Sequence, residues 1–200
     1  MTWLDPVHRG YVHGRRVRVL LSHLAPLLPL DAKVLDVGAG DGHVARGLMD
    51  ARPDVEIVGI DPLVRSDTQI PVTEFDGTTI PFTDRSFDAV LFVDVLHHAG
   101  DQMALLREAR RVAGRAVIIK DHRRDGFLSA PTLRFMDAVG NRRHGVALPY
   151  AYWSSAEWRR AFAEVGLELE VDIRRLGLYP FPASLLFDRG LHFVARLRPA

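Results

Sequence analysis

Three glycines at alternate positions, Gly38, Gly40 and Gly42, follow a short apolar run that contains one acidic residue, Asp36. Glycine lets the backbone approach a ligand where a side chain would collide with it. The helical pattern after the glycines would add free N–H groups and the positive end of a helix dipole. The segment therefore predicts a site for a nucleotide pyrophosphate or for the amino-acid and ribose parts of an adenosyl cofactor.

The glycine spacing helps to choose between these cofactors. A dinucleotide-binding turn has the pattern G-x-G-x-x-G, whereas this sequence has G-x-G-x-G. Asp36, two positions before Gly38, would repel a pyrophosphate but attract the ammonium group of a methionine moiety. Asp61 stands 21 residues beyond Gly40, where a carboxylate can accept both ribose hydroxyls. That role is common to NAD and to adenosyl cofactors, so Asp61 alone does not discriminate.

Histidines supply the candidate groups for proton transfer. His97 and His98 follow one apolar run, His122 follows the next, and His144 lies further along the chain. Ligands collect at the carboxyl ends of parallel strands, where a histidine could act as general base. Polar residues after a buried strand are also typical of an ordinary loop. The four histidines are therefore candidates for a base, which is needed only if the reacting atom of a substrate must lose a proton.

The elements that would position these residues alternate between two patterns. Five apolar runs predict buried strands, at 33–37, 55–60, 72–75, 87–93 and 116–119. Amphipathic patterns predict helices over 6–28, around 44–49 and around 101–112. Strands that alternate with helices indicate βαβ units and a parallel sheet.

The pattern changes after residue 121. The segment 121–153 is rich in His, Arg, Tyr and Trp, with one expected helix near 128–139. Ser154 and Glu157 form a capping-box pattern that opens a helix, and two strands, 167–173 and 191–197, close the chain. We expect a single domain over 1–200, divided into a helical lid at about 5–30, a cofactor-binding core at about 31–120, a substrate-capping segment at about 121–153 and a closing helix and strands at about 154–200.

Composition limits the function classes. The 200 residues are 48% hydrophobic and 26% charged, as in one globular domain, and the net charge of +1 lacks the basic footprint of a nucleic-acid binder. The absence of cysteine excludes a thiolate zinc site and a cysteine nucleophile. The N-terminus has no signal pattern, and the apolar stretch 17–30 is too short and polar to span a bilayer. We expect a cytoplasmic protein with no membrane contact and no nucleic-acid partner.

Five motifs occur in order: Val34–Ala45, Val58–Pro62, Phe75–Gly77, Ser86–His98 and Leu105–Val112. Together they resemble class I S-adenosylmethionine-dependent methyltransferases, and most of all the type-11 methyltransferase domain of the small-molecule branch. The resemblance covers residues 33–120 well and the remainder in outline. It implies a doubly wound, Rossmann-like α/β sheet of seven strands in the order 3-2-1-4-5-7-6. This sheet would be mostly parallel, with the last-formed strand antiparallel and helices on both faces.

The resemblance also implies the contacts of S-adenosylmethionine and its product S-adenosylhomocysteine. Asp36 would lie beside the methionine part, Asp61 beside the ribose and Asp76 beside the adenine amino group. Asp94 would face the sulfonium, and Tyr11 would belong to the N-terminal lid. The full set of implied cofactor contacts is Asp36, Gly38, Ala39, Gly40, Asp61, Pro62, Asp76, Gly77, Asp94 and Tyr11.

Motifs that are missing from the sequence limit the class of molecule that could accept the methyl group. No Asn/Asp-Pro-Pro-aromatic tetrapeptide follows the run 87–93, and Asp121-His122 departs from the metal-assisted catechol pattern, so no metal is expected. Methyl transfer to a small molecule remains, with O-, N- and C-methylation undistinguished and the oligomeric state open. The alternatives are a non-catalytic binder of the same cofactor, a nicotinamide-dependent dehydrogenase and an RNA methyltransferase.

Overall fold

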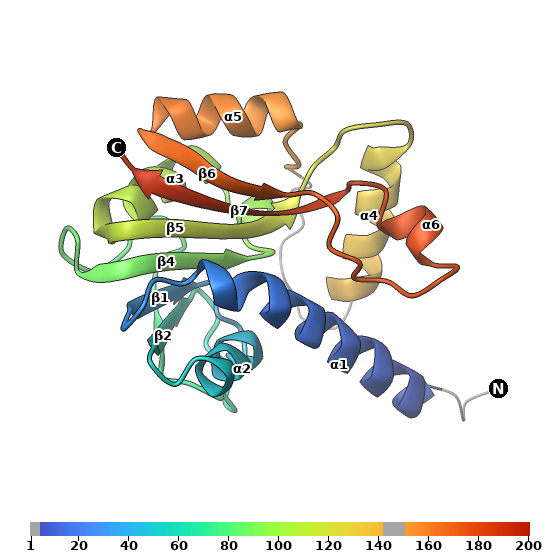
Figure 1. The fold of residues 1–200 in the computed structure, drawn as a ribbon, viewed down its shortest axis with the longest axis horizontal. Coiled ribbons are helices and arrows are strands. Elements are labelled where there is room, and N and C mark those ends of the chain that lie inside the picture. Colours follow the sequence, from blue (N-terminus) through green and yellow to red (C-terminus); the bar gives the residue numbers. More distant parts are fainter. Residues whose placement is uncertain (1–4, 142–150) are drawn as a thin grey trace.

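The computed structural model describes the backbone of residues 5–141 and 151–200 and the side chains of 14–138 and 151–200. The strands are β1 (Lys33–Val37), β2 (Glu56–Asp61), β3 (Val72–Glu74), β4 (Phe87–Val93), β5 (Ala113–His122), β6 (Leu167–Ile173) and β7 (His192–Pro199). They form one sheet in the order β3-β2-β1-β4-β5-β7-β6 (Figure 1). β7 is antiparallel to both neighbours, and the other pairs are parallel. The Rossmann-like sheet that the motifs imply is therefore confirmed.

Helices cover both faces of this sheet. They are α1 (Asp5–Leu24), α2 (His43–Ala51), α3 (Gln102–Val112), α4 (Ser129–Asn141), α5 (Ser155–Glu164) and α6 (Ser184–Phe187), with short 3-10 turns at Ala25–Leu27 and Leu96–His98. None of the helices in the described residues combines the length and hydropathy that a bilayer crossing needs.

Alternate residues of β1 show why its apolar run is continuous. Val34 packs with Leu20 of α1 and Leu48 of α2 on one face of the sheet. Leu35 belongs to the core on the other face, together with Leu106 of α3 and Phe162 of α5. Because successive side chains of a strand point to opposite faces, a strand covered on both sides needs apolar residues throughout.

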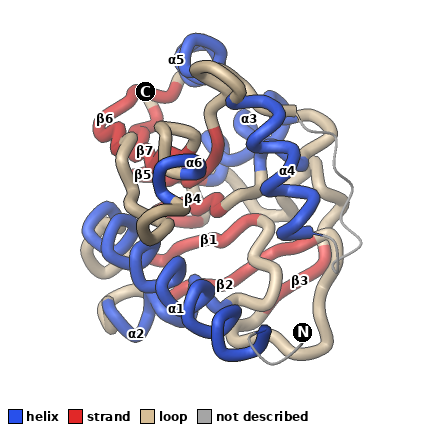
Figure 2. Tube along the Cα trace, turned by 90° about the vertical axis from the view of Figure 1, so that its right-hand side faces the viewer, coloured by secondary structure: helices blue, strands red, loops and turns tan. Residues whose placement is uncertain are grey.

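The carboxyl ends of β4 and β5 point toward the end of the molecule that carries α4 and α6 (Figure 1). Figure 2 looks at this end directly and shows α1, α4 and α6 in front of the strand ends. Ligand sites of open α/β sheets lie at this edge. The helices α1, α4 and α6 therefore lie at the end of the molecule where a ligand site is expected.

The fifth strand is longer than the sequence predicts. We expected it to span 116–119, but β5 begins at Ala113 and continues through Lys120 and Asp121 to His122, which pairs with His192 of β7. Hydrophobic periodicity missed the extension at the carboxyl end because its three residues are polar, although they are buried. The first helix is shorter than expected, since α1 ends at Leu24 and a 3-10 turn with an early proline follows it.

The capping box at the start of α5 is present as predicted. The Ser154 backbone N–H donates to Glu157 Oε2 at 2.7 Å, and Ser154 Oγ accepts from the Glu157 N–H at 3.3 Å. One turn later, the Trp158 indole N–H donates to the His122 carbonyl at 3.0 Å. The cap therefore begins a helix that is anchored directly to the end of β5.

Replacing Ser154 by alanine removes the side-chain half of this cap. We expect Ser154→Ala to lower the free energy of unfolding by about 1 kcal/mol, because an N-terminal N–H of α5 loses its acceptor. For a chain of this size the melting temperature falls by roughly 2–4 °C. Thermal unfolding checks this against Ser66→Ala, which changes an exposed loop serine. Equal melting temperatures for the two variants would contradict the role of the cap.

Candidate functional site

The glycine loop after β1 adopts a backbone that favours glycine. Gly38, Gly40 and Gly42 have φ angles of +74°, +59° and +75°. A Cβ added to Gly38 would also lie 2.6 Å from Val95 Cγ2, closer than carbon atoms can approach. The Gly38 N–H donates to the Ile60 carbonyl at 2.7 Å, which holds the loop against β2. A side chain in place of Gly38 would therefore collide with Val95.

A cavity of about 670 Å³ opens beside the loop. This volume lies in the ordinary range for cofactor sites. Seven of the ten implied cofactor contacts line it: Gly38, Gly40, Asp61, Pro62, Asp76, Gly77 and Asp94. Asp36 and Ala39 are not among its lining residues. The side chain of Tyr11 lies outside the described residues.

Two carboxylates at this cavity are fixed by backbone N–H groups. Asp61 accepts from the N–H of Gly40 and of Leu63, both at 2.8 Å, one on each carboxylate oxygen. Asp76 Oδ1 accepts from the N–H of Thr79 at 2.6 Å and of Thr78 at 2.7 Å. These bonds, first that from Thr79, lower the pKa of Asp76. Both groups are thus oriented acceptors, suited to the hydroxyl and amino donors of a nucleoside.

Asp36 lies in the middle of β1 and is only 3% exposed. Burial, and then the negative charge of Asp61, raise the pKa of Asp36 to about 7. A carboxyl group in this state is poised to ionise when a cation comes near. The arrangement suits the ammonium group of a methionine moiety and would disfavour a pyrophosphate.

Asp94 sits at the end of β4 with a φ of +60° and joins three elements. Its carboxylate accepts hydrogen bonds from Lys120 Nζ of β5 and Arg16 Nη2 of α1. Burial opposes ionisation, but Lys120 and then Arg16 hold the pKa of Asp94 well below its usual range. Lys120 itself is fully buried. Asp94 is therefore a permanent anion that ties the N-terminal helix to the sheet.

His97 is clamped between two carboxylates. Its Nδ1 lies 2.6 Å from Asp121 Oδ1, and its Nε2 lies 3.6 Å from Asp137 Oδ2 of α4. Burial works against the charged ring, but the charge of Asp121 and the hydrogen bond that Nδ1 donates to it outweigh burial and raise the pKa of His97 to about 10. His97 is therefore an imidazolium at neutral pH and has no free nitrogen to accept a proton.

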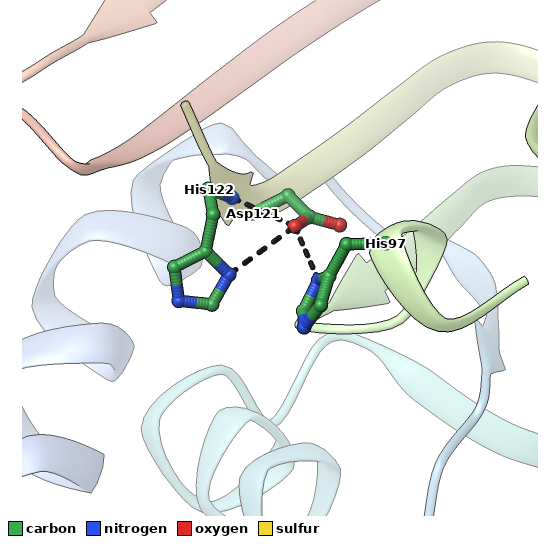
Figure 3. Close-up of side chains that lie close together, drawn as sticks. All are labelled: His97, Asp121 and His122. Atoms are coloured by element: carbon green, nitrogen blue, oxygen red, sulfur yellow. Dashed lines mark hydrogen bonds and ion pairs between the residues drawn. The ribbon is translucent and has the colours of Figure 1, made fainter. Parts of the chain in front are cut away.

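His122 and His98 differ from His97 and from each other. His122 lies on the other side of Asp121 (Figure 3) and is 5% exposed. Burial, and then Lys120, lower its pKa to about 4. His98 is half-buried, and of the described candidate histidines it alone lines the cavity. Burial and then the charge of His97 lower the pKa of His98. His144 lies outside the described residues.

Several residues of the site were missed by the sequence reasoning. Asp137 of α4 binds His97 and also accepts a hydrogen bond from the Tyr152 hydroxyl. No local pattern marks either residue, since they meet only when α4 folds over the strand ends. Among these residues, Lys120 could have been recognised from the sequence, because it is a charged residue directly after the apolar run 116–119.

Two side-chain groups here have spacing that would suit a metal ion. One is His97, Asp121 and His122, and the other is His97, His98 and Asp137, with ligand atoms within 4.8 Å of one another in each group. The charges already balance, however, because the carboxylates of Asp94, Asp121 and Asp137 face the cations of Arg16, Lys120 and His97. A divalent ion would add charge to a neutral cluster, so the expectation of no metal stays a prediction.

Known proteins resemble this chain over most of its length. A family model described as a methyltransferase domain matches residues 8–171. The 27-O-demethylrifamycin SV methyltransferase of Amycolatopsis mediterranei is 30% identical over 192 residues, 84% of this chain and 68% of that protein. The demethylmenaquinone methyltransferase of Thermotoga maritima is 39% identical over 98 residues, 44% of this chain and 43% of that protein.

A solved structure shows the same fold. It is a Thermotoga maritima S-adenosylmethionine-dependent methyltransferase described as a possible histamine N-methyltransferase. Its TM-score is 0.68 at 20% identity, with 96% of this chain and 94% of that chain covered. The family match spans most of the sequence, and the cavity presents the oriented acceptors that an adenosyl cofactor needs. The chain therefore belongs to the S-adenosylmethionine-dependent methyltransferases, and S-adenosylmethionine is its cofactor.

Proposed function

We propose that this enzyme methylates a small-molecule acceptor, with His98 as general base where the acceptor atom must lose a proton. The observation that carries the assignment is the position of His98 on the cavity wall as a neutral imidazole. His97 is already protonated, and His122 is buried away from the cavity with a low pKa. The names of the two curated relatives, which refer to demethylrifamycin and demethylmenaquinone, support a small-molecule acceptor.

The cofactor contacts follow from the fixed carboxylates. Asp61 keeps lone pairs beyond its two backbone bonds and accepts the ribose hydroxyls. Asp76, an oriented acceptor, takes the adenine amino group, and Gly77 lies next to it on the cavity wall. Asp36 acts by its charge on the methionine ammonium from beneath the glycine loop. Asp94 lines the same cavity as an anion, as expected of a group that faces the sulfonium.

The chain has little covalent chemistry to perform. S-adenosylmethionine supplies a methyl group on a sulfonium, which is already an activated leaving group. The protein therefore has to align the acceptor atom at near-attack distance and exclude water. His98 receives the proton that an O–H or N–H acceptor releases. The clamped His97 keeps a positive charge beside His98, which favours the neutral, proton-accepting form of His98.

Cofactor binding can be tested by thermal unfolding of the protein with Asp61→Ala as the variant. S-adenosylhomocysteine at 100 times its dissociation constant adds about 2.7 kcal/mol, which corresponds to a rise of roughly 5–10 °C. We expect the rise in the wild type and its loss in Asp61→Ala. Asp67→Ala, a charge change on an exposed loop residue, is the matched control. A full rise in Asp61→Ala would remove Asp61 from the site, and a rise with NAD instead would overturn the assigned cofactor contacts.

Asp36→Asn should stabilise the protein while weakening its cofactor binding. The folded pKa of about 7 exceeds the unfolded value of about 3.9, so the wild type loses stability as the pH rises from about 4 to 7. Asparagine does not titrate. We therefore expect the variant to exceed the wild type in free energy of unfolding at pH 8, by on the order of a few kcal/mol, at about 1.4 kcal/mol per pKa unit. At pH 4 the difference should vanish.

Urea unfolding at pH 4 and pH 8 measures this difference, and calorimetry measures S-adenosylmethionine affinity. Asp67→Asn removes one exposed charge and should change neither quantity. A variant that is less stable than the wild type at pH 8 would contradict the buried state of Asp36. Unchanged cofactor affinity would show that Asp36 does not act on the ammonium group.

The two neighbouring histidines should titrate far apart. We expect the pKa of His98 to lie below 6.5 in the wild type, because of burial and then the charge of His97. His97→Gln removes that charge and should raise the pKa of His98 toward 6.5. Asp137→Asn removes a negative charge that raises this pKa and should lower it. NMR titration of the imidazole signals measures the pKa of His98 in the wild type and in both variants.

A variant of His98 tests whether this residue accepts the proton of the acceptor. With a panel of O–H and N–H acceptors that includes 27-O-demethylrifamycin SV, His98→Ala should lower kcat by about 10²–10⁴-fold. The S-adenosylhomocysteine thermal shift should be retained in this variant. In the wild type, the acidic limb of the kcat profile should follow the pKa of His98 measured by NMR. Full turnover in His98→Ala would exclude it as the base.

A further inference from the structure

The carboxylate of S-adenosylmethionine needs a cation near the glycine loop. In the methionine part of the cofactor this carboxylate shares one carbon atom with the ammonium group that Asp36 attracts, so both groups must lie close to the loop. The carboxylates of Asp61 and Asp76 line the cavity there, and like charges repel one another. A positively charged side chain at the cavity would offset this repulsion.

Arg65 is the only arginine or lysine among the described residues that line the cavity. It lies in the loop after β2, four positions beyond Asp61. Its Nη2 lies 3.5 Å from the position that a Cβ on Gly40 would occupy. The guanidinium group therefore lies against the glycine loop on the side of the cavity.

Two other cations near the strand ends are already paired with a buried partner. Lys120 Nζ and Arg16 Nη2 both donate to the carboxylate of Asp94, and Lys120 is fully buried. Neither residue lines the cavity. Moving one of them toward a ligand would leave Asp94 with less compensation for its lost hydration. Arg65 is thus the cation that can turn toward a bound carboxylate at the lower cost.

The present partner of Arg65 holds it only weakly. Arg65 Nη1 lies 3.4 Å from Asp41 Oδ2, and the two side chains are 41% and 44% exposed. Exposed ion pairs of this kind contribute little to stability. Asp41 Oδ1 also accepts from the N–H of His43, the first residue of α2, at 3.1 Å. The Asp41 carboxylate therefore keeps a hydrogen-bond partner when Arg65 turns away.

We propose that Arg65 binds the methionine carboxylate of S-adenosylmethionine and gives up its ion pair with Asp41 to do so. A guanidinium group presents two parallel N–H donors to the two oxygens of a carboxylate. The inference rests on the cofactor orientation proposed above, with the ammonium group at Asp36 and the ribose at Asp61. Arg65 then selects adenosyl compounds that carry an amino-acid group over those that lack the carboxylate.

Calorimetry with a series of ligands isolates the contribution of the carboxylate. S-adenosylhomocysteine has both charged groups, S-adenosyl-3-thiopropylamine lacks the carboxylate, and 5′-methylthioadenosine lacks both. Arg65→Gln should weaken the binding of S-adenosylhomocysteine by about tenfold, because the carboxylate loses a charged hydrogen-bond donor. The same variant should not weaken the other two ligands. Arg65→Lys keeps the charge without the paired donors, so its affinity for S-adenosylhomocysteine should lie between those of the wild type and Arg65→Gln.

Arg115→Gln is the matched control. Arg115 Nη1 lies 3.6 Å from Asp88 Oδ1, its side chain is 50% exposed, and it lies near the start of β5, outside the cavity. This variant should change none of the affinities, and the melting temperature without ligand checks that each variant is folded. Equal weakening of the whole series by Arg65→Gln would overturn the proposal, because Arg65 would then contact the adenosine. An unchanged affinity for S-adenosylhomocysteine would overturn it as well.

Asp61→Ala tests the cofactor orientation separately from Arg65. This variant should weaken the whole ligand series, including 5′-methylthioadenosine, because each ligand has the ribose. Normal binding of 5′-methylthioadenosine by Asp61→Ala would overturn the orientation and, with it, the role of Arg65. Weakened binding there, together with no loss of S-adenosylhomocysteine affinity in Arg65→Gln, would overturn the role of Arg65 alone.

Discussion

Three carboxylates meet beyond the carboxyl ends of β4 and β5, those of Asp94, Asp121 and Asp137, and each is matched by a cation. Leaving one of them unpaired would cost several kcal/mol, because a buried ion has lost its water. Asp94 is matched by Lys120 and Arg16, and the carboxylates of Asp121 and Asp137 share His97. The six groups come from α1, β5, α4 and the segment 94–98 that follows β4. This single electrostatic requirement therefore fixes how the helices at the open end of the molecule sit on the sheet.

The same requirement divides the work among neighbouring histidines. His97 serves as a cation because carboxylates face both of its nitrogens. His122 remains neutral because it is buried and because the charge of Lys120 lies close to it, and both effects lower its pKa. His98, one residue from His97 but on the cavity wall, has neither constraint. Identical side chains thus acquire different protonation states from their surroundings. The residue types alone do not reveal those surroundings.

The fold was predictable where a signal is local. The bounds of β1, β4 and β6 follow from short apolar or alternating runs, and the glycine loop follows from residues within one turn. β5 was underestimated because its last residues are polar and are buried only by their partners. The contact of Asp137 with His97 joins residues 40 positions apart, and no periodicity encodes it. Seven of the implied cofactor contacts line the cavity, whereas their individual roles stay predictions.

The position of β7 has a consequence for the order of folding. It lies between β5 and β6, so Val117 pairs with Leu197 across 80 positions of the chain. Pairings this distant form slowly, because a long loop must close before any contact forms. Until the final strand is inserted, β5 lacks a neighbour on one side, and His192 is not yet beside Lys120. The half of the sheet from β3 to β4 can assemble from local βαβ units, but the half from β5 to β6 is completed only when β7 is inserted.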